Sequence, residues 1–212
     1  MVKIHFDAVQ TVLCLGAHSD DIEIGCGATI RKLTRLRPEL AVWWVVFTAK
    51  GKRAAEAKSS ARVFLRNAGK VQVFVKQFRN GYFPFEGAAI KDFFESLKSR
   101  VTPDLIFTHF RDDRHQDHRL ISDLTWNTFR NHLILEYEIP KYDGDIASPN
   151  VFVPFDEQTA AEKADHLCRF FSTQTNKHWF DKNTFLALMR LRGIECCAQY
   201  AEAFYGRKIV CG

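Results

Sequence analysis

The hydrophobic positions of the chain fall into short continuous runs separated by segments with helical spacing. Apolar runs without alternation, such as 11–16 and 41–47, are typical of strands that are buried on both faces of a sheet. In the segments between them, apolar side chains recur every three or four residues, as in amphipathic helices. The pattern predicts strands over 11–16, 41–47, 71–75, 105–108, 133–138 and 151–153, and helices over 23–36, 54–68, 87–100, 119–131, 157–171 and 184–192.

Strand and helix alternate along most of the chain, which favours a parallel sheet covered by helices. We therefore predict an α/β fold with a Rossmann-like, mostly parallel sheet and helices on both faces. With 212 residues, 46% of them hydrophobic, the chain can bury one substantial core but is short for two. Residues 1–212 are accordingly expected to form a single domain.

Two polar clusters directly follow predicted strands. The first, Ala17-His18-Ser19-Asp20-Asp21, comes after the strand at 11–16, and the second, 109–118, comes after the strand at 105–108. Ligands of open α/β sheets bind at the carboxyl ends of the strands. Both clusters are therefore expected at one edge of the sheet, where side chains serve chemistry rather than packing.

Three side chains of these clusters form a candidate metal site. His18 and Asp21 are three positions apart, so both can face one point, and His118 supplies a third ligand. Two imidazoles and one carboxylate leave coordination positions open, as in catalytic zinc sites. We expect one Zn²⁺ per chain; iron, manganese or cobalt also suit this ligand set.

Further polar residues surround the predicted ligands. Asp20 projects to one side and can take a proton from metal-activated water. His115 can act as an acid or stabilise an oxyanion, and Asp117 is expected to orient its imidazole. The run Gly25-Cys26-Gly27-Ala28-Thr29 does not predict a dinucleotide site, because Ile30 replaces the third glycine and the acidic loop would repel a pyrophosphate.

The basic segment 48–53 and the aromatic segment 82–85 are candidates for substrate contact. Arg53 lies at the same predicted edge as the polar clusters and would suit an acidic or hydroxyl-bearing ligand. Two alternatives remain open: Arg53 pairs with an acid such as Glu56, and the aromatics belong to the core. Both readings are compatible with the sequence alone.

Composition narrows the class of protein further. The net charge of +5 comes from basic residues scattered in ones and twos, which favours small acidic ligands over nucleic acid. Six cysteines without a CxxC pair indicate reduced thiols and a cytoplasmic protein. The N-terminus lacks a signal-peptide pattern, and the apolar run 41–47 is too short to span a bilayer.

Three segments resemble motifs of one family. The segment 17–27, AHSDDIEIGCG, resembles the AH-P-DD-x-E-x-G-C-G signature of the PIG-L (LmbE-like) zinc-dependent N-deacetylases. The segment 113–118 is similar to their second motif, and 200–204 to a segment near the end of bacterial members. Ser19 and Gln116 stand where prolines are usual, which bears on loop rigidity more than on chemistry.

The resemblance implies a role for each candidate residue. It makes His18, Asp21 and His118 the zinc ligands. It makes Asp20 the general base, with His115 stabilising the tetrahedral intermediate. Asp117 would tune His115, and Arg53 would contact substrate.

The resulting expectation is a metal-dependent amidohydrolase that deacetylates an N-acetylglucosamine-type sugar, free or linked to a nucleotide or lipid. One alternative is a non-haem iron enzyme with the same ligands, although those enzymes place an HxD pair on an all-β fold. Another is a catalytically silent sugar-binding relative, which would not need Asp20 and His115. The sequence is compatible with a homo-oligomer and does not select the substrate.

Overall fold

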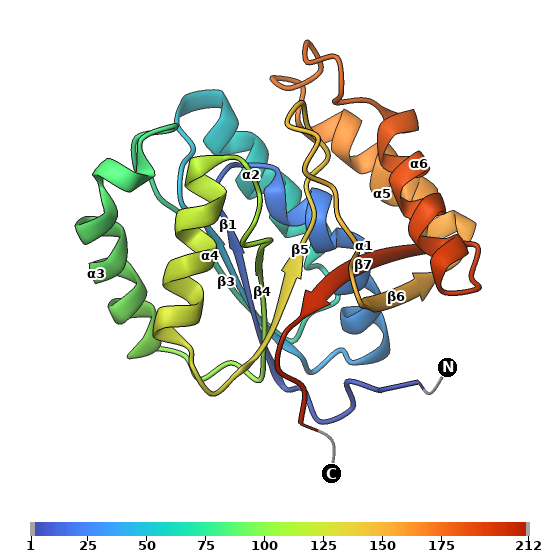
Figure 1. The fold of residues 1–212 in the computed structure, drawn as a ribbon, viewed down its shortest axis with the longest axis horizontal. Helices are drawn as coiled ribbons and strands as arrows, with labels where there is room; N and C mark the ends of the chain where they lie inside the picture. Colours follow the sequence, from blue (N-terminus) through green and yellow to red (C-terminus); the bar gives the residue numbers. More distant parts are fainter. Residues whose placement is uncertain (1–2, 211–212) are drawn as a thin grey trace.

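Seven strands join in one sheet in the order β3-β2-β1-β4-β5-β7-β6 in a computed structural model that describes residues 3–210 (Figure 1). The strands are β1 (Thr11–Gly16), β2 (Ala41–Val46), β3 (Lys70–Val75), β4 (Leu105–His109), β5 (Leu133–Tyr137), β6 (Val151–Phe155) and β7 (Tyr200–Gly206). Strands β1 to β5 pair in parallel, whereas β7 is antiparallel to both β5 and β6.

Helices pack on both faces of this sheet (Figure 1). The helices are α1 (Asp21–Leu36), α2 (Gly51–Phe64), α3 (Gly87–Lys98), α4 (Gln116–Thr128), α5 (Glu157–Phe170) and α6 (Lys182–Glu195). Buried side chains of α1, α2, α5 and α6 share one core, and those of α3 and α4 belong to a second core on the other face. The predicted α/β class, with a mostly parallel sheet between two helical layers, is confirmed.

The strand order reverses between β1 and β4. From β1 the chain winds outward through β2 and β3, and from β4 it winds in the opposite direction to β5, with helices on opposite faces. The loops that leave the carboxyl ends of two such strands diverge and open a crevice, which is where open α/β sheets bind ligands. Both polar clusters therefore begin at this switch point.

Strand β7 is the main element that the sequence pattern did not predict. It lies between β5 and β6, and its residues 201–205 are all buried. The strand was not predicted because the charged Glu202 interrupts its run of apolar residues. The Glu202 carboxylate is neutralised by Lys163 of α5, whose Nζ lies 2.6 Å from Oε1.

Glu202 also explains a break in α1. Cys26 has non-helical dihedral angles (φ −141°, ψ 15°), so the helix is interrupted there. The Glu202 carboxylate accepts hydrogen bonds from the backbone N–H groups of Ala28 (2.8 Å) and Thr29 (2.7 Å) just beyond the break. The second half of α1 is thus capped by a side chain from β7. Gly25 is required beside the break, because a Cβ there would lie 2.2 Å from the ring of Tyr137.

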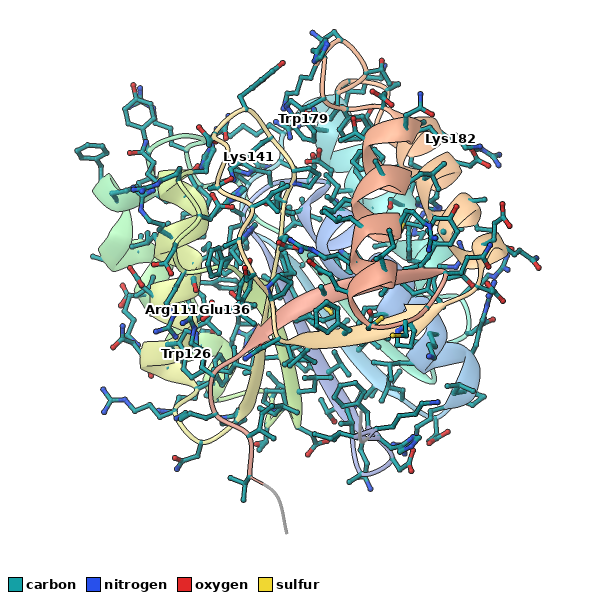
Figure 2. The ribbon with its side chains drawn as sticks, turned by 45° about the vertical axis from the view of Figure 1, so that its right-hand side comes forward. Arg111, Trp126, Glu136, Lys141, Trp179 and Lys182 are labelled. Carbon is teal, nitrogen blue, oxygen red and sulfur yellow. The ribbon has the colours of Figure 1, made fainter. Side chains whose placement is uncertain are left out.

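A buried carboxylate on β5 ties the chain that follows β7 to the rest of the sheet. Glu136 is fully buried and accepts hydrogen bonds from Nε of Arg111 (3.0 Å), Nε1 of Trp126 (2.7 Å) and Nη2 of Arg207 (3.1 Å). Figure 2 shows Arg111, Trp126 and Glu136 gathered beside α4. Since each carboxylate oxygen has partners, this charge is satisfied structurally.

Some helix boundaries differ from the prediction. Helix α4 begins at Gln116 rather than at 119, because the imidazole of His115 caps it by accepting a hydrogen bond from the N–H of Asp117. Helix α6 begins at Lys182 because Asp181 caps it. None of the helices in residues 3–210 combines the length and apolar character needed to cross a bilayer, and the five cysteines in this range are free.

Candidate metal centre and active site

The first polar cluster is held at the exit of β1 by its own backbone. Asp21 is the first residue of α1, and its Oδ2 accepts a hydrogen bond of 2.6 Å from the backbone N–H of His18. A carboxylate in this position is favoured by the helix dipole. The turn therefore brings the side chains of His18 and Asp21 to one side, as their spacing predicted.

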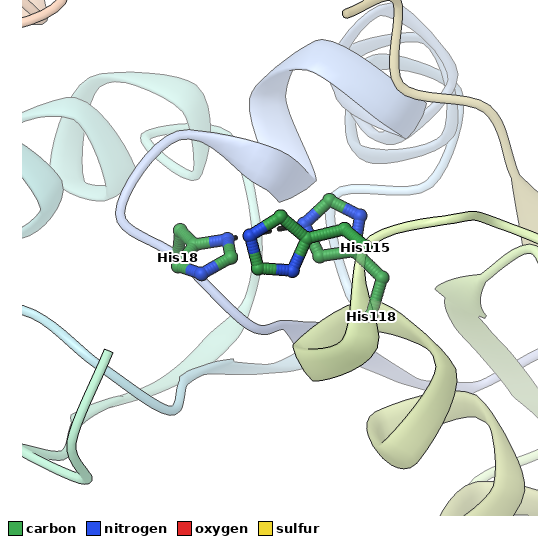
Figure 3. Close-up of side chains that lie close together, drawn as sticks. All are labelled: His18, His115 and His118. Carbon is green, nitrogen blue, oxygen red and sulfur yellow. Dashed lines mark hydrogen bonds between the residues drawn. The ribbon is translucent and has the colours of Figure 1, made fainter. Parts of the chain in front are cut away.

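The three expected metal ligands converge. Nδ1 of His18 lies 3.0 Å from Nε2 of His118 and 3.3 Å from Oδ2 of Asp21, and Nε2 of His118 lies 3.6 Å from the same oxygen. Ligand atoms at about 2.0–2.1 Å from a tetrahedral zinc ion lie about 3.3–3.4 Å apart. Figure 3 shows the rings of His18 and His118 facing each other, one from the loop after β1 and one from α4. The three atoms can therefore bind one small metal ion.

Each imidazole of this set has a carboxylate on its other nitrogen. Nδ1 of His118 lies 2.9 Å from Oδ2 of Asp113, and Nε2 of His18 lies 3.3 Å from Oδ2 of Asp117. Such carboxylates accept a hydrogen bond from the far nitrogen, so in the neutral imidazole that binds a metal the nitrogen that faces the centre keeps its lone pair. This donor set fits a zinc ion and its usual supporting groups.

The charges of the cluster favour a cation at its centre. Burial disfavours a charged His18, yet the carboxylates of Asp21 and Asp117 outweigh it and raise the pKa of His18 to about 9. Burial also disfavours the charged form of Asp21, but His118 and His18 hold the pKa of its carboxyl well below the usual range. The carboxylates thus attract positive charge, which a metal ion would supply.

Asp20 lies beside this set and is not one of its donors. It is buried, and burial together with the neighbouring Asp21 raises its pKa. Its Oδ1 accepts hydrogen bonds from Oγ of Ser19 (3.2 Å) and from Nη2 of Arg53 (3.4 Å). Arg53, in the first turn of α2, therefore pairs with an acid, but this acid is Asp20 and not Glu56, the example that the sequence suggested.

Glu56 instead anchors a distant loop. Its carboxylate accepts hydrogen bonds from Oγ of Ser172 (2.9 Å) and from the backbone N–H of Thr173 (3.1 Å). The loop 171–181 is thereby fastened one helical turn from Arg53. In Figure 1 this loop rises above the carboxyl edge of the sheet, next to the loop that follows β5.

The expected pair between Asp117 and His115 is not formed. The Asp117 carboxylate is directed to His18 and to the backbone N–H groups of Gly81 (2.7 Å) and Phe83 (3.1 Å), so the prediction that it orients His115 was wrong. It is the backbone N–H of Asp117 that contacts His115, donating to Nδ1 at 3.2 Å. Accepting at Nδ1 leaves the proton of His115 on Nε2. Burial and the charge of His18 lower the pKa of His115, which favours this neutral form.

His109 belongs to the site but was given no role from the sequence. It is fully buried at the end of β4, and its ring stacks on His118 with centroids 3.9 Å apart. Asp21, His109 and His118 also offer donor atoms within 4.8 Å of one another. However, Nε2 of His109 accepts a hydrogen bond of 2.9 Å from the N–H of Ala17. Its lone pair is therefore used, and His18 is the better third ligand.

The aromatic segment divides between core and surface. Phe83, in the short 3-10 helix η1 (Phe83–Phe85), is fully buried, and its ring lies 6.3 Å from that of His18. Phe83 is thus part of the core beneath the site rather than a substrate contact. Tyr82 and Phe85 are exposed, and their rings lie 6.0 Å apart.

Several solved structures share this fold across nearly the whole chain. N,N'-diacetylchitobiose deacetylase from Pyrococcus horikoshii is 20% identical, with 95% of this chain and 85% of that chain covered and a TM-score of 0.69. A deacetylase of the teicoplanin biosynthesis pathway is 14% identical (92% and 97% covered, TM-score 0.70). The 4-carboxy-2-hydroxymuconate hydratase of Pseudomonas putida KT2440 is 15% identical (96% and 99% covered, TM-score 0.66). At these identities the likeness establishes the fold, which serves both deacetylases and a hydratase.

The sequence itself matches a family profile, described as PIG-L: GlcNAc-PI de-N-acetylase, over residues 13–129. This range runs from β1 to the residue after α4 and is more than half of the chain. It contains both polar clusters and every side chain of the candidate metal centre. The chain belongs to the PIG-L family.

Proposed function

We propose that the protein is a zinc-dependent hydrolase that removes the acetyl group from an N-acetylated amino sugar. The observation that carries this proposal is the close approach of His18, Asp21 and His118, with Asp20 and His115 beside them. Membership of the PIG-L family and the deacetylases among the proteins of the same fold support it.

The metal would be held by His18, Asp21 and His118. Bound there, zinc would supply Lewis-acid activation of a water molecule and of the amide carbonyl. Asp113 and Asp117 fix the ring orientation of the two histidines, so the donor atoms are preorganised.

Asp20 and His115 would handle the protons and the developing charge. The Asp20 carboxylate takes the proton of the attacking water and returns it to the amide nitrogen as the C–N bond breaks. The Nε2–H of His115 donates to the carbonyl oxygen as negative charge develops on it. The products are acetate and the protonated amino sugar: water supplies the oxygen that the acetyl carbon gains and the two hydrogens that the nitrogen gains, so atoms and charge balance.

The substrate class follows from the groups that flank the site. We propose an N-acetylglucosamine-type sugar, with a nucleotide or lipid phosphate as the most suitable aglycone. Arg53 would contact the substrate, because its side chain is still 29% exposed while its guanidinium contacts Asp20. The net charge of +5 also favours an anionic conjugate.

A hydratase reaction is the main rival, because one protein of this fold is a hydratase. The two activities give different products. We would incubate purified zinc-loaded protein with free, nucleotide-linked and lipid-linked N-acetylglucosamine and measure acetate together with the free amine. Acetate and amine in equal amounts are expected. Absence of both from all three substrates would overturn the proposal.

A further inference from the structure

Ser19 occupies a position from which it can act on the proposed base. The residue is fully buried between the metal ligand His18 and Asp20. Its Oγ accepts a hydrogen bond from Nε of Arg53 at 3.1 Å and donates one to Oδ1 of Asp20 at 3.2 Å. The hydroxyl thus joins a side chain of α2 to the carboxylate at the start of α1.

The two bonds act on the same oxygen of Asp20. Oδ1 receives both the Ser19 hydroxyl and Nη2 of Arg53, at 3.2 and 3.4 Å. Within residues 3–210, no hydrogen bond to the other oxygen, Oδ2, is found. One oxygen is therefore held, and the other is free to accept a proton.

The donor nitrogens of Arg53 are likewise divided into bonded and free ones. Its Nε and Nη2 face Ser19 and Asp20, whereas Nη1 has no hydrogen-bond acceptor among the residues that the structure describes. The guanidinium is planar and presents its donors in a fixed fork, so fixing one edge also fixes the direction of the other. Nη1 is then aimed by the same contacts that hold Asp20.

We infer that Ser19 is a positioning residue, whose hydroxyl ties Arg53 to Asp20, fixes Oδ1 and leaves Oδ2 as the proton acceptor. The inference rests on the proposed function for its catalytic consequence but on geometry alone for the tie. A proline, which the motif resembling this segment carries at this position, has no hydroxyl and forms neither bond.

The tie has a signature that does not depend on activity. A hydrogen-bonded Arg Nε–H exchanges slowly with water, so its ¹H–¹⁵N signal reports the bond to Ser19. The Arg53 signal is assigned by its loss in Arg53→Lys. We expect its exchange with water to accelerate about tenfold or more in Ser19→Ala and to return toward the wild-type rate in Ser19→Thr, which restores the hydroxyl.

Kinetics then test the consequence for the base. Loss of a hydrogen bond to a charged group should lower kcat for acetate release about tenfold in Ser19→Ala, with KM within about twofold and metal content unchanged. Ser19→Thr should recover most of kcat. Ser122→Ala is the matched control, because it removes another fully buried serine hydroxyl, one without a hydrogen-bond partner.

The outcomes separate this inference from the proposed function. If the Arg53 Nε–H exchanged with water at the same rate in a folded Ser19→Ala protein, Ser19 would not hold Arg53, whatever the activity of the variant. Accelerated exchange with unchanged kcat would overturn the positioning role. If the wild-type protein released no acetate at all, the proposed function would fail, while the exchange measurement would still decide whether Ser19 holds Arg53.

Discussion

Oδ2 of Asp113 lies 2.9 Å from Nδ1 of His118, in a buried contact on the side of the ring that faces away from Asp21. The same carboxylate oxygen lies 3.0 Å from Nζ of Lys141, in the loop that follows β5 (Figure 2). His118 and Lys141 together hold the pKa of Asp113 far below its ordinary value, although burial opposes this. Asp113 therefore stays ionised and keeps the proton of His118 on Nδ1.

Asp113→Asn should weaken zinc binding about 10- to 100-fold, as is typical when the carboxylate behind a metal-binding histidine is lost. Competition with a chelator of known affinity measures this. Asp112→Asn is the control, since its side chain is 72% exposed and it is the adjacent residue. Equal affinities for the two variants would mean that Asp113 does not orient His118.

His118→Ala should remove the bound metal, whereas His109→Gln should retain it. His118 directs Nε2 to the centre, while Nε2 of His109 is occupied by the N–H of Ala17. Metal analysis of the purified variants is sufficient. Stoichiometric metal in His118→Ala, or its loss in a folded His109→Gln, would assign the ligands differently.

The sheet and its helical layers could be predicted because apolar runs are local features of the sequence. The ends of the strands are local features too, so the convergence of His18, Asp21 and His118 could also be predicted. Strand β7 could not, since its buried Glu202 is satisfied by Lys163, which lies 39 residues earlier. Local sequence cannot reveal a charge partner that only the fold brings near.

The partner of Asp117 was mispredicted for a related reason. Sequence proximity favoured His115, two residues away. In the structure Asp117 sits in the first turn of α4, and its carboxylate faces the loop at Gly81 and Phe83 as well as His18. His109 was placed in the second polar cluster but given no role, because the sequence does not show that it ends β4 and stacks its ring on His118.

Glu202→Gln should destabilise the fold by about 3–5 kcal/mol, because it leaves the Lys163 ammonium buried without its partner. The substitution also weakens the cap on Ala28 and Thr29 at the break in α1. Denaturant unfolding measures the change. Glu157→Gln, on the exposed side of α5, should change stability by less than about 0.5 kcal/mol. Similar stabilities for both variants would contradict a structural role for the buried pair.

His166 should make the protein less stable in mild acid. Its ring is buried against Phe64 and Ser60, and burial together with the charges of Arg31 and Arg169 lowers its pKa to about 3. An unfolded histidine titrates near 6.5, so the unfolded chain takes up the proton first as the pH falls, and stability decreases.

When the pH is lowered from 7 to 5, the titration of His166 should lower the free energy of unfolding by about 1–2 kcal/mol. His166→Gln should lose that part of the pH dependence, whereas His178→Gln, at an exposed position, should keep it. Parallel stability curves for wild type and His166→Gln would show that His166 does not titrate differently on folding.

The most direct test of the account compares acetate release by three forms of the protein: zinc-loaded wild type, the same protein after chelation, and zinc-loaded Asp20→Asn. With N-acetylglucosamine and its nucleotide- and lipid-linked conjugates as substrates, the wild type should release acetate and free amine in equal amounts. Chelation should abolish this, and Asp20→Asn should keep its metal but turn over about 100- to 10,000-fold more slowly. Undiminished release after chelation or by Asp20→Asn, or no release by the wild type from any of the three substrates, would contradict a metal-dependent deacetylase with Asp20 as its base.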